Sequence, residues 1–271
     1  MPELPEVETT RRGIESHLLG RCVEAVVIRN PNLRWKVPDT LARELPGQTV
    51  HAVERRAKYL LLYADRGTVI VHLGMSGSLR VVACSEPAER YDHVDLVLTG
   101  GTCLRLRDPR RFGSVLWTRS APADHALLKN IGPEPLAAAF DGAYLHTCTR
   151  RRTVAIRDLL LNTRIVAGIG NIYANEALFQ ARIRPARRAG RLSRADCDRL
   201  VGAIRATLAQ AIEAGGTTLR DFQNADGNPG YFQQVLSVYG RAGEPCRQCG
   251  TPVRALRIGQ RRAFFCPRCQ H

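Results

Sequence analysis

Four cysteines near the end of the chain have the spacing of a metal site. Cys246 and Cys249 form one C-x2-C pair, Cys266 and Cys269 form another, and sixteen residues separate the two pairs. Four thiolates satisfy the tetrahedral coordination of a structural zinc ion and leave no position open for catalysis. The spacing therefore predicts one bound Zn2+ in a β-hairpin finger, with a redox pair or two disulfides as the alternatives.

The first residues of the chain could supply a nucleophile. Removal of Met1 would leave Pro2 with a free secondary amine. An α-amino group has an ordinary pKa of about 7.7–8, so a useful fraction is unprotonated at neutral pH, unlike a lysine with a pKa of about 10.4. Glu3 stands next to this amine, where a carboxyl group could act as a general acid. Taken alone, Pro2 is more simply a rigid second residue and Glu3 a carboxylate at a helix start.

Lys58 is a further candidate because lysine is rare in this chain. The sequence has forty basic residues, and only three of them are lysines. A lysine kept between Arg55-Arg56 and a predicted strand suggests that a compact cationic donor is needed there. A solvated surface charge is the alternative interpretation.

The positive charge of the chain is concentrated in its second half. The net charge is +15, but residues 1–149 hold 19 Lys/Arg against 17 Asp/Glu, whereas residues 150–271 hold 21 against 8. A basic half usually binds a polyanion, because each basic side chain near a phosphate releases a counterion. Nucleic acid is thus the expected partner, against the alternative of a general bias toward arginine. The segment between the cysteine pairs shares this character, so we expect the finger to hold an arginine against DNA.

The sequence shows no membrane span and no signal peptide, so we expect a cytoplasmic protein. In that compartment, the five cysteines outside the finger are expected to be small buried residues rather than bridges.

The hydrophobic pattern of the chain has a helical period in some stretches and a strand-like alternation in others. The helices and strands that it predicts must position these residues. Pro5, an apolar face containing Val7, Ile14 and Leu18, and a stop at Gly20 predict a helix over about 5–19. Alternating runs then predict an antiparallel sandwich or barrel. Their ranges are 22–29, 49–53, 59–64, 68–72, 78–82, 93–98, 102–107 and 114–118.

After a proline-rich hinge at 132–135 the pattern changes to helices, expected at about 153–164, 172–181 and 194–214. A tight turn at 167–171 separates the first two, and 217–240 is a long polar loop of the kind that is usually functional or disordered.

Seven motifs in one order resemble the bacterial formamidopyrimidine-DNA glycosylase family from end to end. They are 1–12 (MPELPEVETTRR), 55–62 (RRAKYLLL), 72–80 (HLGMSGSLR), 108–113 (DPRRFG), 168–176 (GIGNIYANE), 215–240 and the finger. The resemblance implies an α+β multidomain fold. It consists of an N-terminal antiparallel β-sandwich with an N-terminal helix (1–133), a linker (134–150), a helix-two-turn-helix domain (151–240) and a C-terminal zinc finger (241–271).

The resemblance also implies a base-excision repair enzyme that removes oxidised purines from damaged double-stranded DNA and cuts the strand by β,δ-elimination. Pro2 matches the family's nucleophile and Glu3 its general acid. Lys58 matches a lysine placed at the lesion's phosphate and in β-elimination. Arg261 matches the finger arginine of δ-elimination, although the adjacent Arg262 leaves this assignment ambiguous by one residue.

A base inside a duplex must be flipped out before it can react, and the gap must be filled. The family's gap-filling residues are matched by Met75, Arg110 and Phe112, whose apolar and planar groups suit insertion into a base stack. Other DNA-contacting positions are matched by His72, Tyr91, Arg151 and Asn171, and residues 217–239 match the loop that covers the extruded base. Tyr91 stands where some relatives have histidine, and the run Arg150-Arg151-Arg152 stands where some have lysines.

Two other functions compete with this interpretation. The related endonuclease VIII-type glycosylases share the proline, the finger and the turn motif but prefer oxidised pyrimidines; MPELPEVE and the Met75, Arg110, Phe112 set favour the purine enzyme. A non-enzymatic zinc protein that binds DNA is the second, and the intact Pro2-Glu3 pair with Lys58 speaks against it. We expect a monomer.

Overall fold

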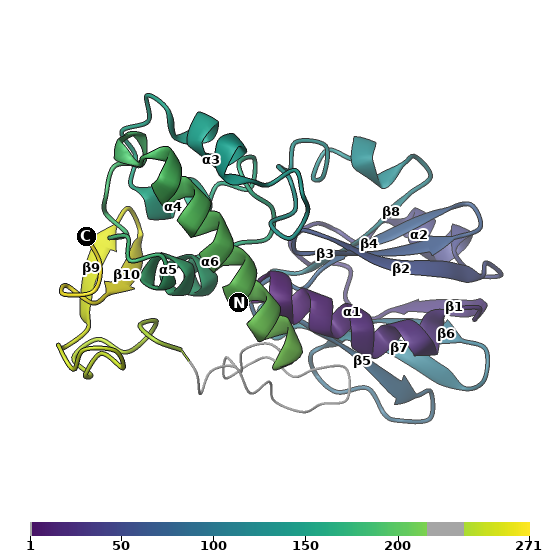
Figure 1. The fold of residues 1–271 in the computed structure, drawn as a ribbon. Helices are drawn as coiled ribbons and strands as arrows, with labels where there is room; N and C mark the ends of the chain where they lie inside the picture. The colour runs from purple at the N-terminus through teal and green to yellow at the C-terminus, as the bar shows by residue number, and fades with distance from the viewer. Residues whose placement is uncertain (1, 216–235) are drawn as a thin grey trace. The chain divides into compact units, whose positions relative to one another are not determined.

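The computed structural model describes residues 2–215 and 236–271, which form two compact units (Figure 1). The first unit comprises the described residues up to Asn130 together with 214–215, and the second comprises Ile131–Glu213 with 236–271. In these two stretches, no helix combines the length and the apolar character needed to cross a bilayer.

The first unit contains the predicted antiparallel β-sandwich. One four-stranded sheet has the order β1-β6-β7-β5, and the other has the order β2-β3-β4-β8. The strands are β1 (Val23–Ile28), β2 (Val50–Arg56), β3 (Tyr59–Ala64), β4 (Gly67–His72), β5 (Ser78–Ala83), β6 (Asp92–Leu98), β7 (Thr102–Arg107) and β8 (Ser114–Thr118). Two short helices, α2 (Asp39–Glu44) and the 3-10 turn η1 (Pro122–Asp124), complete the unit.

Helix α1 (Leu4–Leu18) begins and ends where its sequence signals predict. Pro5 lies in the first turn, where the missing N–H costs no hydrogen bond, and Gly20 follows the last turn with φ +72. Between these signals, Val7, Ile14 and Leu18 recur on one face and are fully buried.

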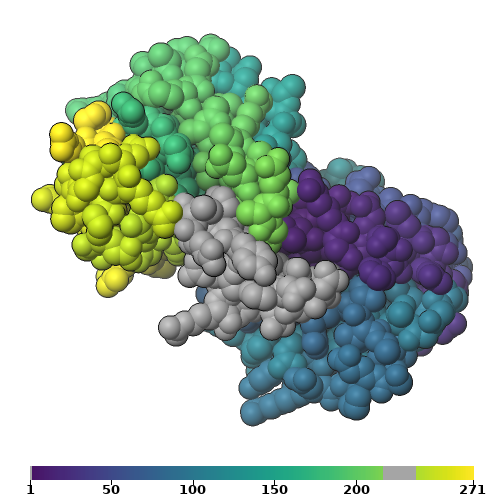
Figure 2. Space-filling view, turned by 60° about the horizontal axis from the view of Figure 1, so that its bottom comes forward, coloured from purple at the N-terminus to yellow at the C-terminus, as the bar shows by residue number. Residues whose placement is uncertain are grey.

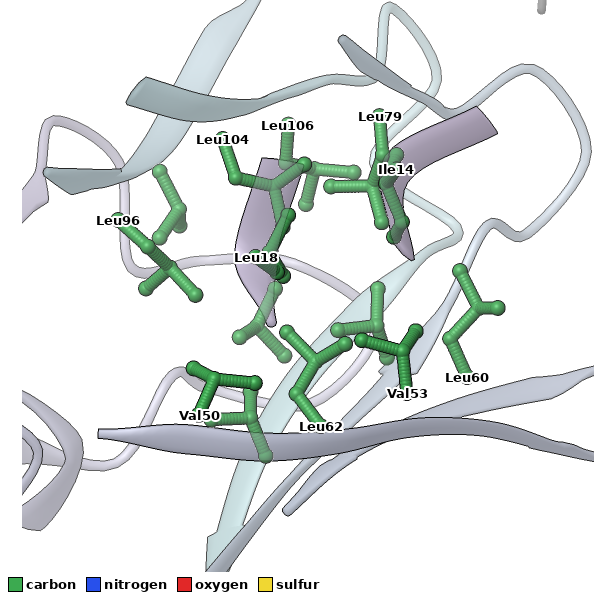
Figure 3. Packing of buried hydrophobic residues seen from close by; sticks show 14 of the residues in the cluster. Ile14, Leu18, Val50, Val53, Leu60, Leu62, Leu79, Leu96, Leu104 and Leu106 are labelled. Carbon is green, nitrogen blue, oxygen red and sulfur yellow. The ribbon is translucent and has the colours of Figure 1, made fainter. Parts of the chain in front are cut away.

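The core of the first unit lies between α1 and the two sheets. Figure 3 shows Ile14 and Leu18 of α1 among leucines and valines of both sheets, such as Leu104 and Leu62. Each such side chain contributes about 1.5–3 kcal/mol when it is fully buried. This core fixes α1, and with it the N-terminal residues, against the sheets.

The second unit contains four helices and a hairpin among its described residues. They are α3 (Gly142–Thr149), α4 (Ile156–Leu160), α5 (Asn171–Gln180), α6 (Arg194–Glu213), the 3-10 turn η2 (Ala189–Arg191), β9 (Arg254–Ile258) and β10 (Arg261–Phe265). The hairpin strands pair antiparallel, and the C-terminal residues, yellow in Figure 2, gather at one end of this unit beside its helices. The helix-two-turn-helix and hairpin-finger architecture is therefore confirmed.

The structure differs from expectation in two places. The stretch 134–150, expected as a linker, contains α3, which packs on α6 and is capped by Asp141 accepting the Tyr144 N–H at 2.7 Å. The helix expected over 153–164 is only α4, because the Asn162 side chain accepts the Arg164 N–H at 3.0 Å and forms a turn instead. Of the loop expected to cover the base, 217–235 lies outside the described residues.

The cysteines outside the finger form no bridges, but their burial varies. Cys103 and Cys197 are buried as expected, whereas Cys84 is exposed. It directly follows β5 (Ser78–Ala83), beyond the cover of the sandwich core.

Candidate functional sites

Pro2 and Glu3 lie at the start of α1 and are buried. Glu3 and Glu6 form a capping box: the Glu3 N–H donates to Glu6 Oε2 at 2.7 Å, and the Glu3 carboxyl group accepts the backbone N–H of Glu6. Glu3 is 2 % exposed and Glu6 is 0 % exposed. A buried second carboxyl group thus holds Glu3 beside Pro2 in one orientation.

Lys58 occupies a tight turn that is tied to α1. Ala57 and Lys58 connect β2 to β3, and Ala57 has φ +53, a backbone conformation that is strained for a residue other than glycine. The Arg55 guanidinium donates to the Ala57 carbonyl at 3.0 Å and to Glu8 Oε2 of α1 at 3.1 Å. Burial opposes ionisation of Glu8, but the surrounding arginines outweigh it and lower the pKa of this carboxyl group. The ionised Glu8 therefore anchors the Lys58 turn to helix α1, which directly follows Pro2 and Glu3.

His72 ends β4 directly opposite Tyr59. Its ring centroid lies 4.8 Å from that of Tyr59, and its Nδ1 accepts the Gly74 N–H at 3.0 Å. Burial, reinforced by the positive charges of Lys58 and Arg34, lowers the pKa of His72 to about 4. The imidazole is therefore neutral at pH 7, and because Nδ1 accepts, Nε2 carries the proton and is a donor.

Met75, Arg110 and Phe112 come together from two loops of the first unit. Met75 is 37 % exposed and Phe112 is 45 % exposed, and the Arg110 guanidinium lies 5.1 Å from the centre of the Phe112 ring. Gly74, with φ +65, makes the close approach possible, since a Cβ there would lie 2.4 Å from the Gly113 nitrogen. The structure thus gathers the three predicted gap-filling residues at the surface.

Tyr91 lies next to the Arg110 loop. Its carbonyl accepts the Asp108 N–H at 3.0 Å. The guanidinium groups of Arg90 and Arg107 lie 5.3 and 5.7 Å from the centre of its ring, which is half-buried. Tyr91 is therefore an aromatic residue with two guanidinium groups close to its ring.

In the second unit, Asn171 is the first residue of α5 and contacts the finger. Its side-chain amide donates to the Arg262 carbonyl at 3.0 Å, and Asn175, one turn later, accepts the Phe264 N–H at 2.7 Å. These two bonds join the start of α5 to strand β10, with Asn171 at Arg262, the residue after Arg261. Arg261 and Arg262 are both exposed, so the choice of Arg261 stays a prediction.

Arg157 is a functional candidate that sequence reasoning missed. It is 1 % exposed, and its Nη2 donates to the carbonyls of Ile258 and Arg261 at 2.9 and 3.1 Å. Burial lowers the pKa of its guanidinium group. Arg157 thus binds both ends of the hairpin turn between β9 and β10, next to Arg261. The only sign of this role in the sequence was a charged residue among the apolar residues Ile156 and Leu159 of a predicted helix.

Arg151 is exposed in the turn after α3, with φ +57. Within the described ranges, no hydrogen bond or ion pair joins it to Asn171 or Arg261. Its predicted role in DNA binding therefore depends on its charge and exposure alone.

Glu176 is a second residue that the sequence did not single out. Its buried carboxylate accepts three backbone N–H groups, from Ser237 at 2.7 Å, Val238 at 2.9 Å and Tyr239 at 2.8 Å. Burial raises the pKa of Glu176, while the three N–H groups oppose that shift. The Tyr239 ring meets Phe264 of the finger edge-on, with the ring centroids 5.1 Å apart. Glu176 therefore anchors the end of the predicted lesion-covering loop on α5.

The four predicted cysteines converge in space. Their sulfur atoms all lie within 4.8 Å of one another, with Cys246 and Cys269 at 4.0 Å and Cys249 and Cys266 at 3.5 Å. Tetrahedral zinc with Zn–S bonds of about 2.3 Å requires sulfur atoms about 3.8 Å apart. A disulfide requires about 2.05 Å, so the cluster fits one structural zinc ion and not two bridges.

Three family models match successive parts of the chain. The model described as "Formamidopyrimidine-DNA glycosylase N-terminal domain" matches residues 1–115, and the one described as "Formamidopyrimidine-DNA glycosylase H2TH domain" matches residues 131–223. The model described as "Zinc finger found in FPG and IleRS" matches residues 243–271.

Whole proteins with the same organisation are also similar. Proteins named formamidopyrimidine-DNA glycosylase from Thioalkalivibrio sulfidiphilus and Pseudomonas aeruginosa are 57 % and 56 % identical, each covering 100 % of both chains. The crystal structure of the MutM (Fpg) protein from Thermus thermophilus is 40 % identical with a TM-score of 0.89 over 99 % of this chain and 98 % of that one. A complex of Lactococcus lactis Fpg with DNA containing an abasic site is 33 % identical with a TM-score of 0.92 over 100 % of both chains.

Proposed function

The chain belongs to the formamidopyrimidine-DNA glycosylase family, and on this premise we propose that it excises oxidised purines from duplex DNA through a Schiff base on Pro2. It is a DNA glycosylase and AP lyase that acts on damaged DNA. The proposed substrates are 8-oxoguanine and formamidopyrimidines, and the proposed strand cleavage proceeds by β,δ-elimination. The observation that carries this proposal is the buried Pro2-Glu3 pair, held by Glu6 at the start of α1.

The reaction begins once Met1 has been removed. The Pro2 nitrogen attacks C1′ of the extruded nucleotide, the bond from C1′ to the base breaks, and the base leaves with its electron pair and a proton. Glu3 protonates the sugar ring oxygen as the ring opens. A secondary amine gives an iminium ion that cannot become a neutral imine by losing a nitrogen proton. This electron sink favours loss of a C2′ proton with departure of the 3′ phosphate, and then loss of the C4′ proton with departure of the 5′ phosphate.

The remaining candidates bind and orient the DNA. Lys58, in the turn before β3, supplies a cation, and His72, at the end of β4, supplies a neutral Nε2–H donor. This pair suits two contacts to phosphate oxygens near the lesion. Met75, Arg110 and Phe112 fill the gap left by the flipped base, with the Arg110 fork facing the orphaned cytosine. Tyr91, Arg151, Asn171 and Arg261 contact the backbone.

Zinc has a structural role in this proposal. Bound by the four cysteines, it would hold the hairpin that presents Arg261, and it would supply no catalytic ligand position. We further propose that the enzyme works as a monomer in the cytoplasm, on chromosomal DNA.

Borohydride trapping tests the nucleophile directly. The processed protein is mixed with a duplex that contains 8-oxoguanine opposite cytosine, reduced with borohydride, digested and sequenced by mass spectrometry. We expect a covalent adduct on the Pro2 peptide, and we expect Pro2→Gly to bind the duplex but to lose most of its excision activity. Wild-type rates in Pro2→Gly, or an adduct on another residue, would refute the assignment. A matched duplex with thymine glycol identifies the rival specificity, since faster excision there would mark a pyrimidine enzyme.

A further inference from the structure

We propose that Asp108 is a positioning residue that locks the Met75 loop (73–77) and the Arg110-Phe112 loop (108–113) into one rigid wedge. This inference rests on the proposed function, in which the tips of these loops enter the base stack. Asp108 itself is completely buried.

The Asp108 carboxylate bonds to both loops at once. Its Oδ1 accepts the Ser76 hydroxyl at 2.9 Å and the Arg110 N–H at 3.2 Å. Its Oδ2 accepts the Gly113 N–H at 2.8 Å. One side chain therefore spans from the residue after Met75 to the residues on either side of Phe112.

The backbone of Asp108 fixes this junction to the sheet beneath it. The Asp108 N–H donates to the Tyr91 carbonyl at 3.0 Å, and the Asp108 carbonyl lies 2.8 Å from Nε2 of the buried His93. The contact between Gly74 and the Phe112-Gly113 backbone closes the wedge from the other side. The two loops thus share a common base and cannot shift separately without breaking hydrogen bonds.

A rigid base matters because the tips themselves are only partly covered by the protein. Met75 is 37 % exposed and Phe112 is 45 % exposed. To separate stacked bases they must press against the duplex from fixed positions, and misplacement of a positioning group by about 1 Å can cost on the order of a hundredfold in rate.

Asparagine is the most informative replacement for Asp108 because it keeps the shape of the side chain but only one of its two acceptor oxygens. No lysine or arginine forms an ion pair with Asp108 in the described part of the chain, so its partners are hydroxyl and N–H donors only. An amide offers one acceptor oxygen, and its NH2 group would face a donor on the other side. In either orientation, Asp108→Asn therefore loses one backbone hydrogen bond to the Arg110-Phe112 loop, from the Arg110 N–H or from the Gly113 N–H.

The experiment compares a substrate that needs a wedge with one that does not. Excision of 8-oxoguanine from duplex DNA requires flipping, whereas strand cleavage at an abasic site in single-stranded DNA does not. We expect Asp108→Asn to lower kcat/KM for the duplex by about ten- to a hundredfold and cleavage of the single strand by less than about threefold. Ser76→Ala, which removes only the bond to the Met75 loop, should lower kcat/KM for the duplex by a smaller factor and should again affect cleavage of the single strand less.

Asp65→Asn is the matched control. The Asp65 carboxylate also accepts a backbone N–H, from Thr49 at 2.8 Å, but it is exposed and lies outside the wedge. This variant should resemble wild type on both substrates. Equal losses on both substrates in Asp108→Asn and Ser76→Ala, or no loss on either, would overturn the inference. If the wild-type protein neither excised 8-oxoguanine from the duplex nor cleaved the single strand at the abasic site, the proposed function itself would be wrong.

Discussion

His72 shows how its surroundings set the state of a single side chain. Burial, Lys58 and Arg34 all disfavour the imidazolium ion, and the pKa of His72 is lowered to about 4. An unfolded histidine has a pKa of about 6.5, so between these values the unfolded chain binds a proton that the folded chain does not. The stabilising effect is therefore complete above pH 6.5 and is lost as the pH falls toward 4.

His72→Gln should remove part of the acid sensitivity of the protein. Glutamine keeps an N–H donor but cannot titrate, so the loss of unfolding free energy between pH 7 and pH 5 should shrink by about 2 kcal/mol relative to wild type. Urea unfolding at the two pH values measures this difference. His17→Gln, at an exposed histidine outside the site, is the control for the exchange of a histidine for glutamine. Equal losses in wild type and His72→Gln would show that His72 is not held neutral.

Among the elements, the strands were predicted best because alternation is a local signal. The predicted ranges for β3 and β7 match the structure residue for residue. Helix α3 was missed because eight residues make a helix only when it packs, here on α6, and prolines shortly before it indicated a linker. The Asp141 cap was the one local signal that could have revealed it.

Some residues of the candidate sites could likewise be recognised from local sequence signals, and others could not. The cysteine spacing and the Pro2-Glu3 pair can be recognised along the chain, and the structure brings the four cysteines together as predicted. Asp108, Arg157 and Glu176 could not be recognised, because their partners are backbone atoms of loops and strands that are adjacent only after folding.

The finger hairpin is held both by its cysteines and by side chains of α4 and α5. We expect Cys249→Ser to lose zinc and to weaken binding to a duplex with a tetrahydrofuran abasic analogue by more than about tenfold, since metal binding and folding of such sites are coupled. Chelator-based zinc release and fluorescence anisotropy measure the two effects. Exposed Cys84→Ser, outside the cluster, is the control. Unchanged affinity in Cys249→Ser would show that the finger is dispensable for binding.

Across the whole molecule, charges serve different ends in the two halves of the sequence. In the first unit the buried Arg105 pairs with Asp95 at 3.0 Å. In the second, Arg151, Arg188 and Arg191 are exposed and form no ion pair with any described residue. Residues 150–271 hold 21 Lys/Arg against 8 Asp/Glu, and exposed arginines such as these are available to phosphates.

Binding of undamaged duplex DNA should therefore depend steeply on salt. A protein that neutralises six or more phosphates loses on the order of a thousandfold in affinity between 50 and 200 mM salt. Titrations of a labelled undamaged duplex across that range give the slope of log K against log salt. A slope shallower than about −2 would contradict a broad phosphate interface.

The capping box has a practical consequence for anyone who wishes to trap the enzyme on its substrate. The Glu3 carboxyl group both starts α1 and, in the proposed mechanism, donates a proton, so truncation to alanine would confound lost chemistry with a frayed N-terminus. Glu3→Gln retains an oxygen for the helix and lacks the acidic proton, which makes it the better inert stand-in for crystallographic snapshots of the uncleaved lesion.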